Sequence, residues 1–299
     1  MNKNLRIYLC AILAMFFWAG SYILTKIVFE NQYRPIMTIF IRLVISSIIL
    51  YVAVRLMKKK QKIDKADYWK FMVLGLMQPF FYFLGESFGL TLVSSTVASV
   101  IISTIPVVTP IFAFIFLKER ISVLNIIGLI ISFFGILLIV FNADYTFDAS
   151  PLGVGLMFFA VSSSLVYAVF VKRLSYKYSP YTIITSQNIL GVFYFLPLFL
   201  IFDFKHFILI KPNTELVLSL LGLAIFASSL AYLLFTSVIK EIGISKANMF
   251  TNLIPVFTAF FSYIILSESF TLNKIIGILI VIVGVMISQI FKVINKMIF

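Results

Sequence analysis

The sequence predicts an all-α integral membrane protein with ten transmembrane helices, arranged as two inverted five-helix repeats. Three observations predict this class: the composition, ten apolar segments of membrane-spanning length, and a stretch of sequence that occurs twice. Of the 299 residues, 62% are hydrophobic and 12% are charged, and the mean hydropathy is +1.11. A soluble domain carries about 25% charged residues, so this chain has too little polar surface to fold in water.

Ten continuous apolar segments approach the roughly 20 residues that a helix needs to cross a bilayer. They do not alternate in polarity as the strands of a membrane barrel do. The first segment follows Lys3 and Arg6, as a signal peptide would, but it continues past Trp18 without an obvious small-residue cleavage site. We therefore expect it to remain as a helix. In chain order, the predicted spans cover residues 7–29, 36–57, 69–90, 94–117, 122–141, 152–171, 181–202, 215–238, 245–266 and 271–291.

The positive charges predict the orientation in the membrane. With both termini in the cytoplasm, 18 of the 24 Lys and Arg residues lie at the cytoplasmic ends of spans, five lie on the other side, and Arg42 lies within a span. This bias is typical of cytoplasmic loops. It explains the net charge of +13 through an anionic membrane leaflet and without nucleic acid. The expected partners are the lipid bilayer and a small-molecule substrate, and the chain is expected to be a monomer or a weak homodimer.

One stretch of sequence occurs twice. The segment IPVVTPIFAFIFLKER at 105–120 aligns without a gap to IPVFTAFFSYIILSES at 254–269, and 13 of the 36 aligned positions that start with Ile105 and Ile254 are identical. A weaker match relates YRPIMT at 33–38 to YSPYTI at 178–183. Each half, 1–141 and 152–299, then holds five spans, and an odd number turns the second copy upside down. Inverted repeats are a transporter architecture with the substrate site near the midplane.

The chain resembles the EamA-type ten-helix family of the drug/metabolite transporter superfamily. The resemblance rests on FFWAGSYILTK at 16–26, Arg42 in the second span, and the two Pro-to-Glu-to-Gly segments 105–135 and 254–284. It implies a central cavity lined mainly by spans 1, 3, 4, 6, 8 and 9, with spans 5 and 10 packed together. It also implies transport of small metabolites across the bacterial inner membrane, often as export. The first span lacks the carboxylate of the small multidrug branch, which argues against proton-coupled export of cationic drugs by that scheme.

Two charged side chains inside predicted spans are candidates for the chemistry, because a charge in hydrocarbon is costly unless it is paired or hydrated. Glu86 lies roughly 10 Å outside the centre of the third span, at ~1.5 Å per residue. We expect it to bind a substrate amine or to carry the coupling proton, and the alternative is a buried ion pair with Arg42 or Lys26. For Arg42 we favour a structural pair or a snorkelled side chain over direct binding.

A second candidate group is neutral, and several of its members recur at i, i+4, which places two polar groups on one helical face. The alternative is hydrogen bonding between helices or to the helix backbone, which we favour for the serines. Together with Glu86, the group describes an aromatic pocket suited to amino acids or small amphiphilic metabolites. The predicted substrate-binding residues are Trp18, Tyr22, Gln78, Tyr82, Glu86, Ser99, Ser103, Ser164, Tyr167, Tyr232, Thr236, Asn248 and Asn252.

The repeated prolines and glutamates receive structural roles. Pro106 and Pro255 lie near the middle of their spans, where a proline kinks a helix and shapes the site or serves as a hinge. Glu119 and Glu268 lie at helix ends beside the start of the next helix, where a carboxylate accepts backbone N–H bonds. We expect both glutamates to cap the turn into the next span, and the alternative for both is a role in gating.

Other classes of function have less support in the sequence. The single Cys10 and single His206 belong to no cluster with metal-ligand spacing, so we expect no metal or cofactor. No set of nucleophile, base and orienting group stands out, and the loops are short, so a membrane enzyme is disfavoured. A channel stays open as an alternative to a carrier.

Overall fold

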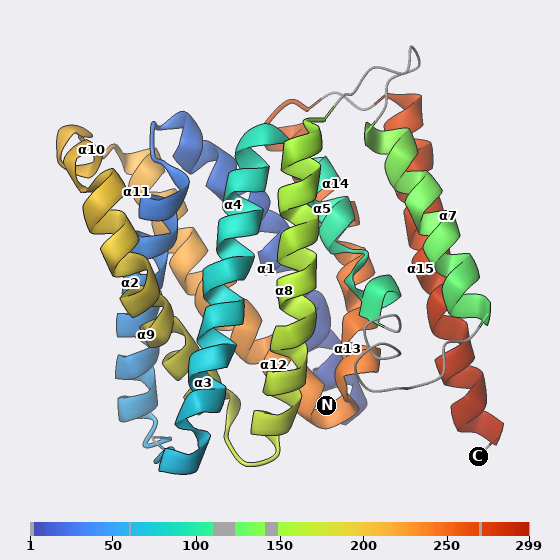
Figure 1. The fold of residues 1–299 in the computed structure, drawn as a ribbon, viewed down its shortest axis with the longest axis horizontal. Coiled ribbons are helices and arrows are strands. Elements are labelled where there is room, and N and C mark those ends of the chain that lie inside the picture. Colours follow the sequence, from blue (N-terminus) through green and yellow to red (C-terminus); the bar gives the residue numbers. More distant parts are fainter. Residues whose placement is uncertain (1–2, 60, 110–122, 141–148, 269–270, 299) are drawn as a thin grey trace.

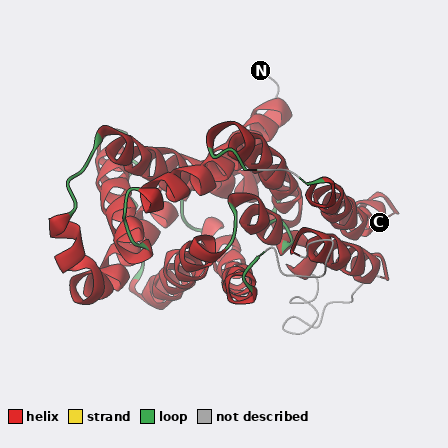
Figure 2. Ribbon diagram, turned by 90° about the horizontal axis from the view of Figure 1, so that it is seen from above, coloured by secondary structure: helices red, strands yellow, loops and turns green. Residues whose placement is uncertain are grey.

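The computed structural model describes residues 3–59, 61–109, 123–140, 149–268 and 271–298. These residues form helices joined by short connections, and no strand occurs among them, so the predicted all-helical class is confirmed (Figures 1 and 2). The helical elements are α1 (Lys3–Glu30), α2 (Pro35–Leu56), η1 (Lys65–Asp67), α3 (Tyr68–Gly75), η2 (Leu76–Phe81), α4 (Tyr82–Leu92), α5 (Ser95–Ile102), α7 (Val123–Val140), α8 (Pro151–Ser175), α9 (Pro180–Leu198), η3 (Phe199–Asp203), α10 (Phe204–Leu209), α11 (Thr214–Gly222), η4 (Leu223–Ala231), α12 (Tyr232–Ile242), α13 (Ile244–Met249), η5 (Phe250–Asn252), α14 (Leu253–Ile265) and α15 (Leu272–Ile298).

Six helical segments of the described chain are long and apolar enough to cross a membrane. Four shorter apolar helices accompany them, at Ser95–Thr109, Ile126–Leu138, Phe250–Ile265 and Leu272–Gly284. Large hydrophobic side chains such as Phe193, Ile201 and Tyr263 are more than 60% exposed on the outer faces of the helices. Such faces suit contact with lipid, so the structure is that of a multi-pass membrane protein.

Two of the long segments are interrupted in the middle by wider helical turns. The first interruption is η2, where Gln78 takes the non-helical angles φ −148° and ψ 118° next to Pro79. The second is η4, between α11 and α12. Side chains of neighbouring helices satisfy carbonyl groups in both, because lipid offers no partner for a free carbonyl. Ser163 donates to the carbonyl oxygen of Met77 at 2.6 Å, and Asn188 donates to that of Ser228 at 2.9 Å.

Each repeated proline lies inside an apolar helical segment, directly after an irregular turn. Helix α5 ends at Ile102, and Pro106 lies in the next short helical stretch, just after that break. Pro255 lies in the first turn of α14, directly after η5. A proline is tolerated in a first turn because its missing N–H has no intrahelical partner there. An irregular turn of the helix therefore precedes each proline.

Helices α7 and α15 pack against each other at one edge of the molecule in both views (Figures 1 and 2). A Cβ added at Gly135 would lie 2.8 Å from the carbonyl oxygen of Gly277, and one at Gly284 would lie 2.8 Å from that of Gly128. Earlier residues of one helix thus meet later residues of the other, so the two helices run antiparallel. The contact needs glycine because the backbones approach closely.

A polar cluster ties the loop after α2 to the loop after α8. The carboxylate of Asp67 accepts hydrogen bonds from Lys70 at 2.6 Å, from Lys177 at 2.7 Å and from the Tyr178 hydroxyl at 2.7 Å. Lys177 also forms an ion pair with Asp64. The hydrogen bond with Asp64, and next in size the one with Asp67, raise the pKa of Lys177 above its usual value. The cluster is therefore held by charged hydrogen bonds at neutral pH.

Candidate functional site

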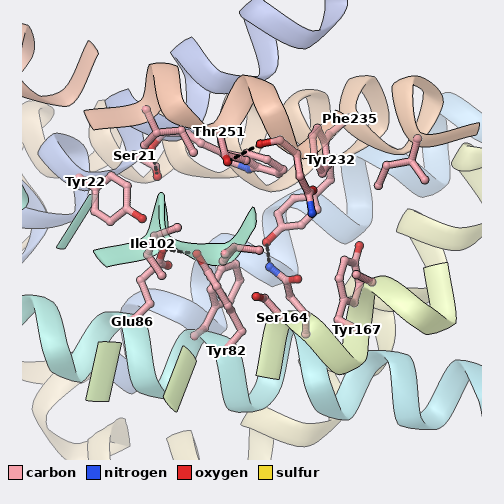
Figure 3. Close-up of a pocket in the computed structure, with 18 of the residues that line it drawn as sticks. Ser21, Tyr22, Tyr82, Glu86, Ile102, Ser164, Tyr167, Tyr232, Phe235 and Thr251 are labelled. Atoms are coloured by element: carbon pink, nitrogen blue, oxygen red, sulfur yellow. Dashed lines mark hydrogen bonds between the residues drawn. The ribbon is translucent and has the colours of Figure 1, made fainter. Parts of the chain in front are cut away.

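A cavity lies between α1, α4, α8, α12 and the segment from α13 to α14 (Figure 3). Both halves of the chain contribute to its wall, as the inverted-repeat interpretation predicts for a substrate site. In the described residues, no group of three or more His, Cys, Asp or Glu side chains is placed to hold a metal ion. The predicted site residues that line the cavity are Trp18, Tyr22, Gln78, Tyr82, Glu86, Ser164, Tyr167, Tyr232 and Asn248.

The acidic end of the cavity is built by Glu86 with two tyrosines. Tyr82 and Glu86 lie one turn apart on α4, and the Tyr82 hydroxyl donates to Oε1 of Glu86 at 2.9 Å. Tyr22 reaches this end from α1 and points toward the same carboxylate (Figure 3). Two phenols beside one carboxylate can stabilise its charge.

The opposite wall is neutral and aromatic. The Gln78 amide donates to the Tyr232 hydroxyl, and this bond joins η2 to α12. The non-helical backbone of Gln78 places its side chain toward α12. Trp18 packs edge-on against Tyr232 and Phe235, with ring centroids 5.1 and 5.0 Å apart. These rings offer a surface for an apolar or aromatic part of a ligand.

Arg42 of α2 also lines the cavity, where sequence reasoning gave it a structural role. Its side chain is 3% exposed, so it does not snorkel to the membrane surface. Its Nε donates to the Ser228 hydroxyl at 2.8 Å, and its Cζ lies 4.4 Å from the centroid of the Phe83 ring. In the described chain the ion pairs lie in the loops or at the helix ends beside them, so the predicted alternative of a direct pair between Arg42 and Glu86 is wrong.

Four predicted binding residues do not line the cavity. Ser99 and Ser103 donate to backbone carbonyl oxygens one turn earlier, at 2.8 and 2.7 Å, as the alternative for the serines predicted. Thr236 is 1% exposed and lies beside Tyr167 outside the cavity wall. Asn252 is the last residue of η5, the tighter turn that follows Asn248, and it is not part of the cavity wall.

Ser228 is a site residue that the sequence analysis did not identify. It lies in η4, is fully buried, and holds the Arg42 guanidinium. The only signal for it was its place in a run of small residues, ASSLA, inside an apolar span. A wide helical turn cannot be recognised from that run, so the direction in which the Ser228 side chain points could not be predicted.

Glu268 caps a helix, but not the one that the sequence analysis named. Its Oε1 accepts from the backbone N–H of Ser95 at 3.0 Å, and its Oε2 accepts from the Thr96 hydroxyl at 2.8 Å. It thus caps α5, whereas the first turn of α15 is capped by Thr271. Nearby, Lys26 donates to the carbonyl oxygen of Val93 at 2.8 Å, so the alternative ion pair of Lys26 with Glu86 is also not formed. Glu119 lies outside the described residues.

Comparisons with known proteins agree on one family. The model of the EamA-like transporter family matches residues 5–141 and 151–289. An uncharacterised transporter of Archaeoglobus fulgidus is 29% identical over 276 residues, which cover 92% of this chain and 95% of that protein. The uncharacterised transporter YetK of Bacillus subtilis is 25% identical, covering 98% and 89% of the two chains. A solved crystal structure with 14% identity has a TM-score of 0.71, covers 95% and 98% of the two chains, and supports the fold alone.

Proposed function

The chain belongs to the EamA-like transporter family, and we propose that it carries small amino-acid-like or other amphiphilic metabolites by alternating access around the described cavity. The observation that carries this proposal is the cavity itself, which both matched halves line with aromatic rings and neutral polar groups. Such a wall suits a small solute with one apolar part and few charges. A nucleotide sugar or another polyanion would need more buried cations than Arg42.

The proposed architecture has ten membrane crossings in two inverted repeats, residues 1–141 and 152–299. The contact between α7 and α15 supports it. At the repeat offset of 149 residues, Ser132 corresponds to Val281, and the Ser132 hydroxyl donates to the Val281 carbonyl oxygen at 3.4 Å. Gly135 faces Gly277, and its counterpart Gly284 faces Gly128, the counterpart of Gly277. This exchange of partners is expected at a two-fold axis between two copies of one motif.

In alternating access the cavity is sealed from one side of the membrane at a time. We propose that Glu268 and Lys26 form the outward seal in this conformation, since the first joins the end of α14 to the start of α5 and the second joins α1 to the end of α4. Opening outward requires both contacts to break. Export is the proposed direction, as the family resemblance implies.

The proposed location is the bacterial inner membrane, with both termini in the cytoplasm. The distribution of Lys and Arg supports this orientation, since most lie at the ends assigned to the cytoplasm. Glu86 is the proposed group for proton coupling, because among the described residues it is the one carboxylate that lines the cavity. The protein is proposed to act as a monomer or a weak homodimer.

Counterflow in proteoliposomes tests the proposal. Liposomes that hold the purified protein are loaded with one unlabelled amino acid or small metabolite, and uptake of the same labelled solute is followed. A carrier gives saturable uptake that the internal solute stimulates, because the loaded cavity returns faster than the empty one. Flux that neither saturates nor shows counterflow for any transported solute would identify a channel and overturn alternating access. Protein-free liposomes are the control.

A further inference from the structure

We propose that Arg42 binds a carboxylate of the substrate, opposite Glu86, which binds the ammonium group, so that the cavity selects zwitterionic solutes. This inference rests on the proposed transport function and adds a residue and a charge pattern to it. Ser228 acts with Arg42 as a positioning residue.

The guanidinium of Arg42 has hydrogen-bond donors left over. Its Nε is used by Ser228 and one face of the group lies on the Phe83 ring. Within the described part of the chain, neither terminal nitrogen has a hydrogen-bond acceptor. A guanidinium carries five N–H donors, and those that no protein group accepts remain free to bind water or a solute. The terminal nitrogens are not among the fully buried, unpartnered atoms of the described chain, and the side chain lines the cavity, so the cavity contents can supply an acceptor.

A carboxylate is the acceptor that this geometry fits. Two N–H groups on one edge of a guanidinium match the two oxygens of a carboxylate, which gives a bidentate pair. Ser228 occupies only Nε, so the edge formed by the terminal nitrogens remains for such a pair. A phosphate would also fit this edge, but a doubly charged group beside Glu86 would meet repulsion.

The opposite charge in the cavity completes the pattern. Glu86 and Arg42 line the same cavity and interact electrostatically across it without forming an ion pair. Tyr82 occupies one carboxylate oxygen of Glu86. A zwitterion with its ammonium at Glu86 and its carboxylate at Arg42 would neutralise both buried charges at once. A simple amine or acid neutralises only one, and this difference produces the selectivity.

A second set of buried polar groups fixes the position of Ser228. Asn188 of α9 donates to the Ser228 carbonyl oxygen at 2.9 Å and to the Ser46 hydroxyl at 2.7 Å. Ser46 and Ser229 share a hydrogen bond of 2.6 Å. These bonds pin the wide turn of η4 to α2 and α9, so the Ser228 hydroxyl is held where the Arg42 Nε needs it. The network orients Arg42 without touching the cavity.

Binding of matched ligands to purified protein tests the inference. The chain has two tryptophans, and Trp18 lines the cavity while Trp69 is 53% exposed on α3. In a Trp69→Phe background, Trp18 fluorescence therefore reports binding. The probes are phenylalanine, phenethylamine, which lacks the carboxylate, and 3-phenylpropionate, which lacks the ammonium. The corresponding leucine, isoamylamine and 4-methylpentanoate are titrated as a second set.

In the parent protein we expect at least one zwitterion to bind about tenfold or more tighter than its amine and acid analogues. Arg42→Gln should weaken that zwitterion by about tenfold to a hundredfold, as loss of a charged hydrogen bond does, and should change the amine by less than about threefold. Arg42→Lys keeps the positive charge but loses the two parallel N–H groups of the guanidinium, so it should bind the zwitterion more tightly than Arg42→Gln but less tightly than the parent protein. Ser228→Ala should weaken the zwitterion by a smaller factor and again spare the amine.

Three results would overturn the inference. These are equal losses for zwitterion and amine in the Arg42 variants, unchanged zwitterion binding in Arg42→Gln, and a parent protein that binds no zwitterion or does not prefer it. If Arg42→Gln fails to fold, Ser228→Ala and Arg42→Lys decide the question, because each should weaken binding of the zwitterion more than binding of the amine. The counterflow assay with other metabolites is independent of these ligands, so a failure here leaves the transport proposal standing, whereas absence of any counterflow defeats the transport proposal itself.

Discussion

Substitution of Gly135 by alanine tests the close contact between α7 and α15. The added Cβ would lie 2.7 Å from the Val281 Cγ2 atom, 2.8 Å from the Val281 nitrogen and 2.8 Å from the Gly277 carbonyl oxygen. Two of these three atoms belong to the backbone and cannot turn away as a side chain can. Helices α7 and α15 must therefore move apart where they are in contact.

The size of the effect follows from two opposed contributions. Overpacking of this kind costs about 1–3 kcal/mol, while replacing a helical glycine by alanine gains up to about 1 kcal/mol from helix propensity. Gly155 on α8 supplies the matched control, since a Cβ there would meet no atom within 4 Å. We expect Gly155→Ala to be neutral or stabilising and Gly135→Ala to be less stable than this control by about 1–3 kcal/mol.

Gly284→Ala should behave like Gly135→Ala, because its Cβ would meet the Ser132 nitrogen at 2.7 Å and the Gly128 carbonyl oxygen at 2.8 Å. The free energy of unfolding is measured by titration with dodecyl sulphate in mixed micelles, followed by circular dichroism. If Gly135→Ala and Gly284→Ala are both as stable as Gly155→Ala, the close antiparallel contact is refuted, and with it the support it gives to the inverted repeat.

Three further predictions concern the cap, the coupling group and the topology. Glu268→Gln should lower the free energy of unfolding by about 0.5–2 kcal/mol through a weaker cap on α5, in the same titration, and unchanged stability would contradict the capping role. Glu86→Gln should abolish uptake driven by a pH gradient while counterflow at saturating solute persists; an unchanged pH dependence would remove Glu86 as the proton carrier. In a Cys10→Ser background, a membrane-impermeant thiol reagent added outside cells should label Lys211→Cys and spare Tyr176→Cys, and the reverse pattern would overturn the orientation.

The sequence predicted those parts of the site that depend on regular helix geometry. Tyr82 and Glu86 stand four residues apart on an uninterrupted stretch of α4, so a shared face followed from the period of the helix, and the two side chains do form a hydrogen bond. Family resemblance added which spans face the centre. Polar residues on those faces then indicated a cavity.

The sequence failed where the helix is irregular. Asn248 and Asn252 have the same four-residue spacing, yet the helix tightens into η5, which ends at Asn252, and only Asn248 lines the cavity. The partner of Glu268 was also missed, because Ser95 is far away in the chain and nothing local indicates which helix start lies beside the carboxylate. Contacts of this kind depend on how spans pack, which a single sequence does not encode in any readable local pattern.

The interrupted turns η2 and η4 explain why the most consequential contacts were the least predictable. Each lies near the middle of its long helical segment, and each sends a side chain to the other half of the chain: Gln78 bonds Tyr232, and Ser228 bonds Arg42. A regular helix would use its backbone groups internally and leave these spans joined by apolar contacts alone. The wide turns release carbonyl groups that Ser163 and Asn188 of other helices satisfy. The Ser163 bond joins the two halves, while Asn188 satisfies a carbonyl of its own half and reaches the first half through Ser46.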